Sequence, residues 1–156
     1  MDTNALRSAH RDLQDSILGD ESSFIAPPDG WDARRLLAHL AIIDELFIDT
    51  TRAVLEGRPA AYDNARATFA PNVDTLATTA TWQQLRSAVE VRANELDSLA
   101  EQLTDQHADT LVHVRVVDGA TVTVDQPVPW GQALNFHAAV HLPAHTNDLR
   151  ALINNH

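Results

Sequence analysis

Apolar side chains recur at helical spacing over four long stretches of the chain, which are residues 3–18, 32–56, 81–106 and 130–154. In the second stretch Leu36, Leu40, Ile43 and Phe47 lie on one face, as the helical period of 3.6 residues requires. Asp32 can cap that helix. Thr81, with Gln84 three residues later, forms a capping box for the third. The pattern therefore predicts four amphipathic helices.

Two segments between the helices differ in pattern. Residues 60–80 are partly helical, but Pro71 and the residue after it interrupt the period, so we expect a loop with short helical pieces. Residues 110–124 alternate with period two around an Asp118-Gly119 turn, which predicts a β-hairpin that the prolines at 127 and 129 should end. Together these patterns predict an all-α protein: an antiparallel four-helix bundle, one domain over residues 1–156, with a small hairpin before the last helix.

The composition of the chain excludes several classes of partner and of chemistry. Eleven basic against twenty-two acidic side chains give a net charge of −11, so we expect no nucleic-acid partner. The start of the chain lacks an export signal and no apolar run is long enough to cross a membrane, so we expect a cytoplasmic protein without a membrane partner. The chain has no cysteine, which excludes disulfides, thiolate ligands and a protein thiol nucleophile.

Histidines carry the candidate chemistry. His137, His141 and His145 follow one another at intervals of four residues, which turns the helix by only about 40° per step. His141 and His145 fall on the apolar stripe of the last helix, while His137 lies at its edge. His39 falls on the apolar face of residues 32–56. We therefore expect His39, His141 and His145 to point into one core.

A metal ion explains this placement best. Buried imidazoles without partners would each cost on the order of 1–3 kcal/mol, whereas an ion takes one lone pair from each ring. Three imidazoles suit zinc first, with nickel or iron also compatible, and leave room for a small-molecule substrate or water. Asp44 and Asp148 are candidates to orient the ligand rings. No catalytic residue or general base can be assigned.

Simpler interpretations stand beside this one. A lone histidine on an apolar face is more often a hydrogen-bonded core residue than a ligand, and histidine pairs four apart also occur by chance. The sequence gives no role to the remaining histidines, which we expect at the surface: His10, His107, His113 and His156. Asp44 and Glu45 could equally form a solvated helix edge. Pro143 should kink the last helix, and His137 offers an alternative partner for His141.

The sequence resembles the DinB/YfiT-like superfamily, and within it the metal-binding domain of the mycothiol-dependent maleylpyruvate isomerases. The resemblance rests on Gly30-Trp31, on residues 36–41 with Asp44, and on the run from His141 to Leu149. It implies a four-helix bundle with a long crossover, a zinc or nickel site, frequent dimerisation, and in some members thiol-dependent transfer or isomerisation. The ligands it implies are His39, His141 and His145.

Three functions follow as hypotheses. The first is an enzyme that activates a low-molecular-weight thiol such as mycothiol against a small electrophile, as an S-transferase or isomerase. The second is a non-catalytic, stress-associated bundle whose metal ion stabilises the fold. The third is a bundle that binds no metal.

Overall fold

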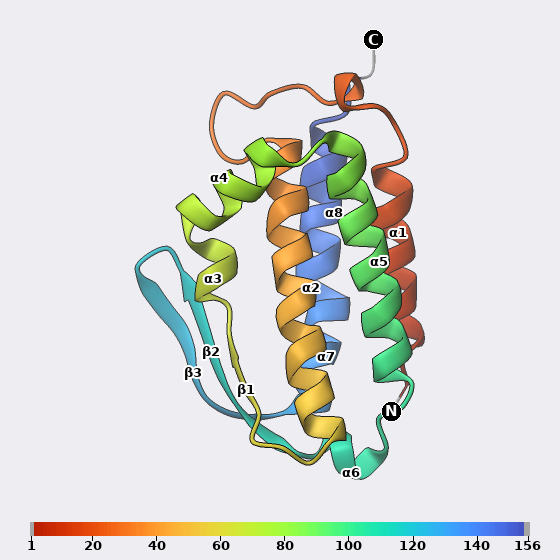
Figure 1. The fold of residues 1–156 in the computed structure, drawn as a ribbon, viewed down its shortest axis with the longest axis vertical. Helices are drawn as coiled ribbons and strands as arrows, with labels where there is room; N and C mark the ends of the chain where they lie inside the picture. Colours follow the sequence, from red (N-terminus) through yellow and green to blue (C-terminus); the bar gives the residue numbers. More distant parts are fainter. Residues whose placement is uncertain (1, 155–156) are drawn as a thin grey trace.

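The long helices lie side by side in the computed structural model, which describes residues 2–154 (Figure 1). They are α1 (Asn4–Ser16), α2 (Ala33–Leu55), α5 (Trp82–Ala100) and a continuous run of α7 (Trp130–Phe136), the π-helical η2 (His137–His141) and α8 (Leu142–Ala151). In Figure 1, α1 and α8 run toward one end of the molecule and α2 and α5 toward the other. The predominantly helical character is confirmed.

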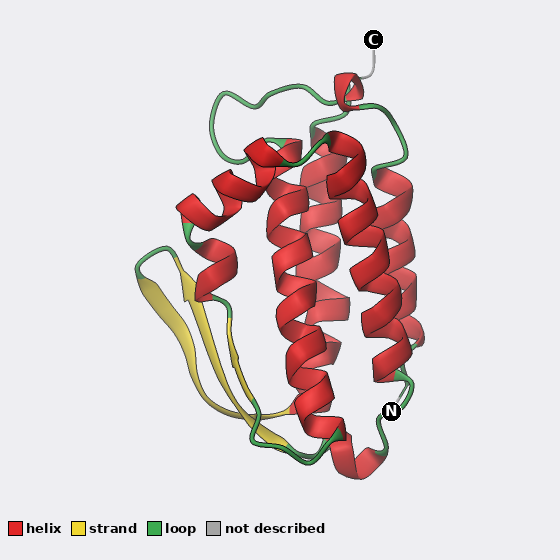
Figure 2. Cartoon of the chain, viewed as in Figure 1, coloured by secondary structure: helices red, strands yellow, loops and turns green. Residues whose placement is uncertain are grey.

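Shorter elements connect the long helices, and they include more β-structure than the sequence predicted (Figure 2). They are η1 (Glu21–Ser23), β1 (Ala61–Asp63), α3 (Ala65–Thr68), α4 (Ala70–Thr79), α6 (Asp105–Ala108), β2 (Leu111–Asp118) and β3 (Thr121–Pro129). The sheet has the order β1-β2-β3, with β1 parallel and β3 antiparallel to β2. A helical protein with a small three-stranded sheet therefore replaces the all-α prediction.

The strand β3 ends at Pro129, as predicted, but it extends through Pro127, where the prediction placed its end as well. Pro127 pairs with His113 and Pro129 with Leu111, both within β3. The strand β3 lies at the edge of the sheet, so no strand among the described residues pairs with its outer side. A residue that lacks an N–H group on that side removes no hydrogen bond from the sheet.

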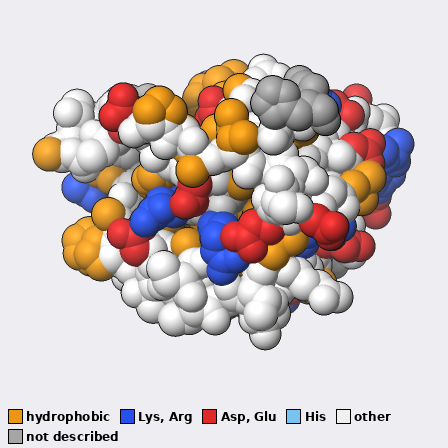
Figure 3. Space-filling model, turned by 90° about the horizontal axis from the view of Figure 1, so that it is seen from above, with side chains coloured by type: hydrophobic (Ala, Val, Ile, Leu, Met, Phe, Trp, Pro, Cys, Tyr) orange, Lys and Arg blue, Asp and Glu red, His pale blue; other side chains and the backbone are white. Residues whose placement is uncertain are grey.

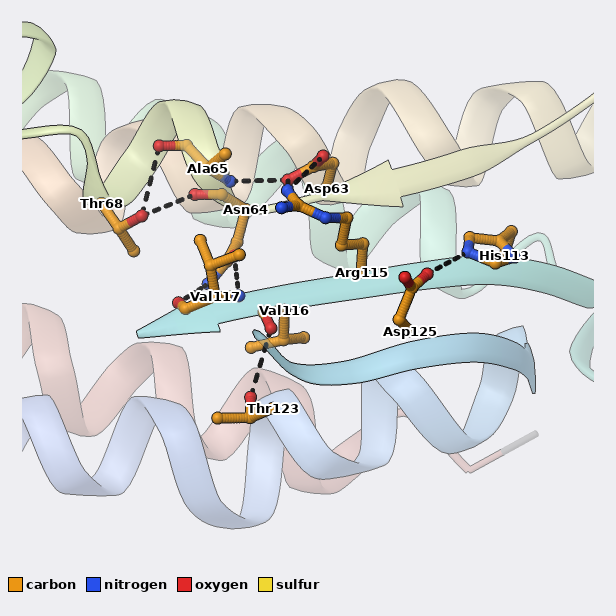
Figure 4. A network of polar contacts seen from close by, with 10 residues as sticks. All are labelled: Asp63, Asn64, Ala65, Thr68, His113, Arg115, Val116, Val117, Thr123 and Asp125. Atoms are coloured by element: carbon orange, nitrogen blue, oxygen red, sulfur yellow. Dashed lines mark hydrogen bonds and ion pairs between the residues drawn. The ribbon is translucent and has the colours of Figure 1, made fainter. Parts of the chain in front are cut away.

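Asn64 joins the short strand β1 to the rest of the sheet (Figure 4). Its side chain accepts a hydrogen bond from the Val117 N–H at 2.7 Å and donates to the Val117 carbonyl at 3.1 Å. Beside it, Arg115 donates to Asp63 at 3.1 Å across the two parallel strands. These contacts fix β1 and, directly after it, α3, which lies against the site described below.

The predicted helix caps are present. Asp32 accepts a hydrogen bond from the Arg35 N–H, and Thr81 and Gln84 form both hydrogen bonds of a capping box. The last helix is irregular near Pro143, because that residue has no N–H to offer the carbonyl four residues earlier. The Leu142 N–H instead reaches the His137 carbonyl, which makes a π-helical turn at the candidate site.

The core lies between the long helices. Leu13, Leu37, Leu85 and Leu149 are fully buried, one on each of the four. Trp130 is also fully buried and donates its indole N–H to Thr51 at 3.0 Å. Each such side chain contributes on the order of 1.5–3 kcal/mol through burial, so the apolar stripes account for the packing of the long helices.

The surface is mixed in charge at the end of the molecule shown in Figure 3, where acidic and basic side chains are interspersed with apolar ones. Within the described part of the chain, no helix combines the length and the apolar character that crossing a membrane requires.

Candidate metal centre

The structure brings His39, His141 and His145 together. His39 comes from α2, His141 from η2 and His145 from α8. One ligand nitrogen from each ring lies within 4.8 Å of the other two. The ring centroids are separated by 5.5 Å for His39 and His141, 5.0 Å for His39 and His145, and 4.6 Å for His141 and His145. Two segments about a hundred residues apart therefore share one cluster, which we call the outer cluster.

Each of these rings has a hydrogen-bond partner at Nδ1. The partner of His39 is the Ala67 carbonyl at 2.8 Å, that of His141 is His137 Nδ1 at 3.1 Å, and that of His145 is Asp148 at 3.1 Å. A carbonyl or carboxylate only accepts, so His39 and His145 carry their proton on Nδ1. Their Nε2 lone pairs are then available, and partners of this kind are typical of metal-binding histidines.

The proton on His141 follows from the residues behind it. His137 Nε2 lies 3.0 Å from the Asp44 carboxylate, which can only accept, so His137 donates there and is left with a lone pair on Nδ1. That lone pair accepts from His141 Nδ1, which leaves the His141 Nε2 lone pair facing His39 Nε2 at 3.3 Å. Two lone pairs at this distance repel each other unless a cation lies between them.

The separation also suits one ion. Two ligands of a tetrahedral ion with bonds of about 2.0–2.1 Å lie about 3.3–3.4 Å apart. The 3.3 Å between His39 Nε2 and His141 Nε2 matches that edge. The residues present therefore fit a divalent metal that accepts imidazole ligands.

Burial keeps these rings neutral. It lowers the pKa of His39 to about 4, and it lowers the pKa of His141 further, with neighbouring imidazoles acting in the same direction. Burial likewise lowers the pKa of His145, although Asp148 opposes the shift. Neutral imidazole is the form that binds metals. At neutral pH the rings of the outer cluster are already neutral, so metal binding does not require them to release a proton.

A pocket of about 410 Å³ opens beside the outer cluster. Its walls include His145, Trp31, Leu36 and the carboxylates of Asp29 and Asp148. The Trp31 ring packs against His39 with a centroid separation of 5.0 Å. A small molecule in this pocket would contact His145 directly.

A second group of ionisable side chains lies deeper in the bundle and was missed by the sequence analysis. His10, Asp44 and His137, the inner cluster, are 1%, 0% and 1% exposed. The predicted surface position of His10 and the alternative of a solvated edge for Asp44 are therefore wrong. A signal existed for both, since His10 continues the spacing of Leu6 and Leu13, and Asp44 stands four residues after Leu40.

His137 was predicted only as an edge residue and as an alternative partner for His141, which it does contact. A regular α-helix places it at the edge of the stripe, but the π-helical turn changes the angle between successive side chains and brings the ring inside. It stacks on Phe47 with centroids 4.3 Å apart. Asp44 therefore reaches the outer cluster only through His137, whereas Asp148 contacts His145 directly, as expected of an orienting residue.

The other predicted residues contribute nothing to the site. His113 is exposed and pairs with Asp125 at 2.6 Å, as its position on the hairpin predicted. His107 lies in the short helix α6, where it forms a capping box with Thr104. His156 lies outside the described residues. Glu45 is half-buried and pairs with Arg66 and Arg92.

Comparison with known proteins places the fold. No family model matches the sequence, and no curated protein matches it either. Among solved structures, the crystal structure of the mycothiol-dependent maleylpyruvate isomerase matches with a TM-score of 0.75 and 16% sequence identity. The match covers 93% of this chain but 57% of the isomerase, so the chain spans little more than half of that protein's length. The chain is therefore similar in fold to the mycothiol-dependent maleylpyruvate isomerase.

Proposed function

We propose that this protein is a metal-dependent enzyme that holds one divalent ion through His39, His141 and His145. Zinc is the first candidate, and nickel or iron also suits three imidazoles. The observation that supports this most is that all three rings are hydrogen-bonded at Nδ1, while one nitrogen of each ring lies within 4.8 Å of the other two. The Nε2 lone pairs then remain for a common ion. A site with three protein ligands keeps a position open for substrate.

The reaction we propose is the activation of a low-molecular-weight thiol, such as mycothiol, for attack on a small electrophile by transfer or isomerisation. A divalent ion held by imidazoles supplies Lewis acidity that lowers the pKa of a thiol or water ligand. The thiol must come from outside, because the chain has no cysteine. Asp148 would hold His145 in place, and Trp31 and Leu36 would shield the reacting groups from water.

The charge of the pocket restricts its substrate. The described residues that line it include two carboxylates, Asp29 and Asp148, and no arginine. Maleylpyruvate is a dicarboxylate, and binding it here would place its charges beside Asp29 and Asp148, with no arginine in the described lining to pair with a carboxylate that does not reach the metal ion. We therefore propose a neutral or cationic electrophile as substrate, in contrast to the substrate named for the isomerase of similar fold.

Metal analysis combined with a conjugation assay tests this function. Purified protein, its His145→Ala variant and a His113→Ala control would be loaded with zinc, and thiol consumption followed with a neutral electrophile. His113 is a suitable control because it also pairs with a carboxylate but lies on the exposed hairpin. We expect the control to match the wild type and His145→Ala to lose at least tenfold in both metal affinity and rate.

The outcomes separate the hypotheses. Bound zinc without turnover would favour the non-catalytic, stabilising role, and the absence of bound metal would refute the proposal. Faster reaction with maleylpyruvate than with a neutral electrophile would refute the charge argument alone. The homodimer remains a prediction from the resemblance, and gel filtration at several concentrations would test it. The cytoplasmic location remains a prediction from the sequence.

A further inference from the structure

The inner cluster draws on all four long helical stretches. His10 comes from α1, Asp44 from α2 and His137 from η2, and Asp97 of α5 contacts His10 from behind. One ligand atom from each of His10, Asp44 and His137 lies within 4.8 Å of the others. Metal sites in helical bundles are commonly built in this way, from side chains on facing helices.

Two atoms of this cluster lack hydrogen-bond partners. Among the described residues, His10 Nε2 and Asp44 Oδ2 are buried side-chain atoms without one, and they lie 3.6 Å apart. That distance is long for a hydrogen bond, whose donor and acceptor lie about 2.7–3.2 Å apart. It is close to the separation of about 3.3–3.4 Å between two ligands of one tetrahedral ion.

Asp97 prepares His10 as a ligand. Its carboxylate lies 2.7 Å from His10 Nδ1, so it holds the Nδ1 proton and turns Nε2 toward Asp44. A carboxylate behind a metal-binding imidazole is the usual arrangement in proteins. Asp44 and Asp97 together bring two negative charges to the cluster, which a divalent cation balances, and buried charges are otherwise paired or bound to metals.

We propose that His10, Asp44 and His137 form a second, closed site for a divalent metal ion such as zinc. The inner site does not depend on the proposed function, because none of its ligands belongs to the outer cluster. Its complete burial leaves no room for substrate, so its ion would stabilise the bundle. Ions would enter from the pocket of about 320 Å³ between α1 and α5, whose lining includes His10 and Asp97.

The proton between His137 and His141 should prevent the inner and outer sites from binding metal at the same time. His137 Nδ1 and His141 Nδ1 lie 3.1 Å apart and share a single hydrogen. If an ion takes the Nε2 lone pair of His137, the hydrogen must be on His137 Nδ1, and His141 then carries its own proton on Nε2. That proton blocks the outer site, so the inner and outer sites should not be filled together.

Metal counting in four forms of the full chain tests this inference. They are the wild type, an outer-site variant (His39→Ala with His145→Ala), an inner-site variant (His10→Gln with Asp44→Asn) and the combination of all four changes. Zinc would be titrated calorimetrically, and circular dichroism would verify folding. We expect one ion per chain in the first three forms and none in the fourth, with at least a hundredfold loss of affinity.

Metal counts that differ from these expectations distinguish the two proposals. A folded outer-site variant that binds no zinc would overturn the inner site and leave the proposed function standing. An inner-site variant without zinc, beside an outer-site variant that retains it, would instead refute the proposed function. If the inner-site changes prevent folding, anomalous diffraction at the zinc edge from the outer-site variant decides, because the inner site requires a peak between His10 and Asp44.

Discussion

His10 should make the stability of the metal-free protein depend on pH. Its ring is 1% exposed, and burial alone would disfavour the charged form. The carboxylates of Asp44 and Asp97 outweigh that effect, so the pKa of His10 is raised from 6.5 to about 9. In the metal-free protein His10 is therefore an imidazolium between two carboxylates at neutral pH.

The sign and size of the effect follow from linkage. Because the folded-state pKa of His10 lies above its unfolded value, protonation stabilises the fold fully below about pH 6.5, and that contribution is lost as the pH rises toward 9. A shift from 6.5 to about 9, at about 1.4 kcal/mol per pH unit, corresponds to at most about 3.5 kcal/mol.

Urea unfolding in the presence of a chelator measures this directly. The free energy of unfolding at about pH 6 and about pH 9 would be compared for wild type, His10→Gln and the exposed control His113→Gln. We expect wild type and control to lose about 2–3 kcal/mol more than His10→Gln across this range. Equal pH dependence in all three proteins would refute the ion pairing at His10.

Further predictions concern the core, the sheet and the outer cluster. Leu37→Ala should lower the free energy of unfolding by about 2–5 kcal/mol, measured by urea titration, because the side chain is fully buried. Asn64→Ala should cost about 1–3 kcal/mol and speed amide exchange at Val117, since two buried backbone groups lose their partner. Zinc affinity of the inner-site variant, measured against a chromophoric chelator, should begin to fall only well below pH 6.5, because burial lowers the pKa of His39 to about 4 and lowers the pKa of His141 and His145 as well. A decline that begins near pH 6.5 would contradict this.

Much of the fold could be predicted because helical periodicity and capping are local. The stripe over residues 32–56 predicted α2 (Ala33–Leu55) within a residue at each end, and the Thr81 capping box predicted the start of α5. The strand β1 could not be predicted. It is three residues long, and its parallel partner β2 begins about fifty residues later, so no local pattern indicates the pairing.

The convergence of the outer cluster followed from which face each histidine occupied. His39 and His145 lie where the α-helical period placed them, and their binding of a metal stays a prediction. The full burial of His137 could not be predicted, since it depends on a π-helical turn caused by Pro143 six residues later. The proton arrangement was also beyond reach, because it depends on contacts such as that of His39 with the Ala67 carbonyl.

Asp44 links the stability of this protein to its metal chemistry. A fully buried carboxylate costs several kcal/mol unless cations or donors compensate. Here the donor is His137, which in turn fixes the proton of His141, and the cation is either protonated His10 or a metal ion. Replacement of Asp44 by a residue that cannot accept the hydrogen bond from His137 should therefore disturb folding and metal binding together. Substitution of His145, which is half-buried and contacts Asp148 near the surface, should disturb metal binding alone.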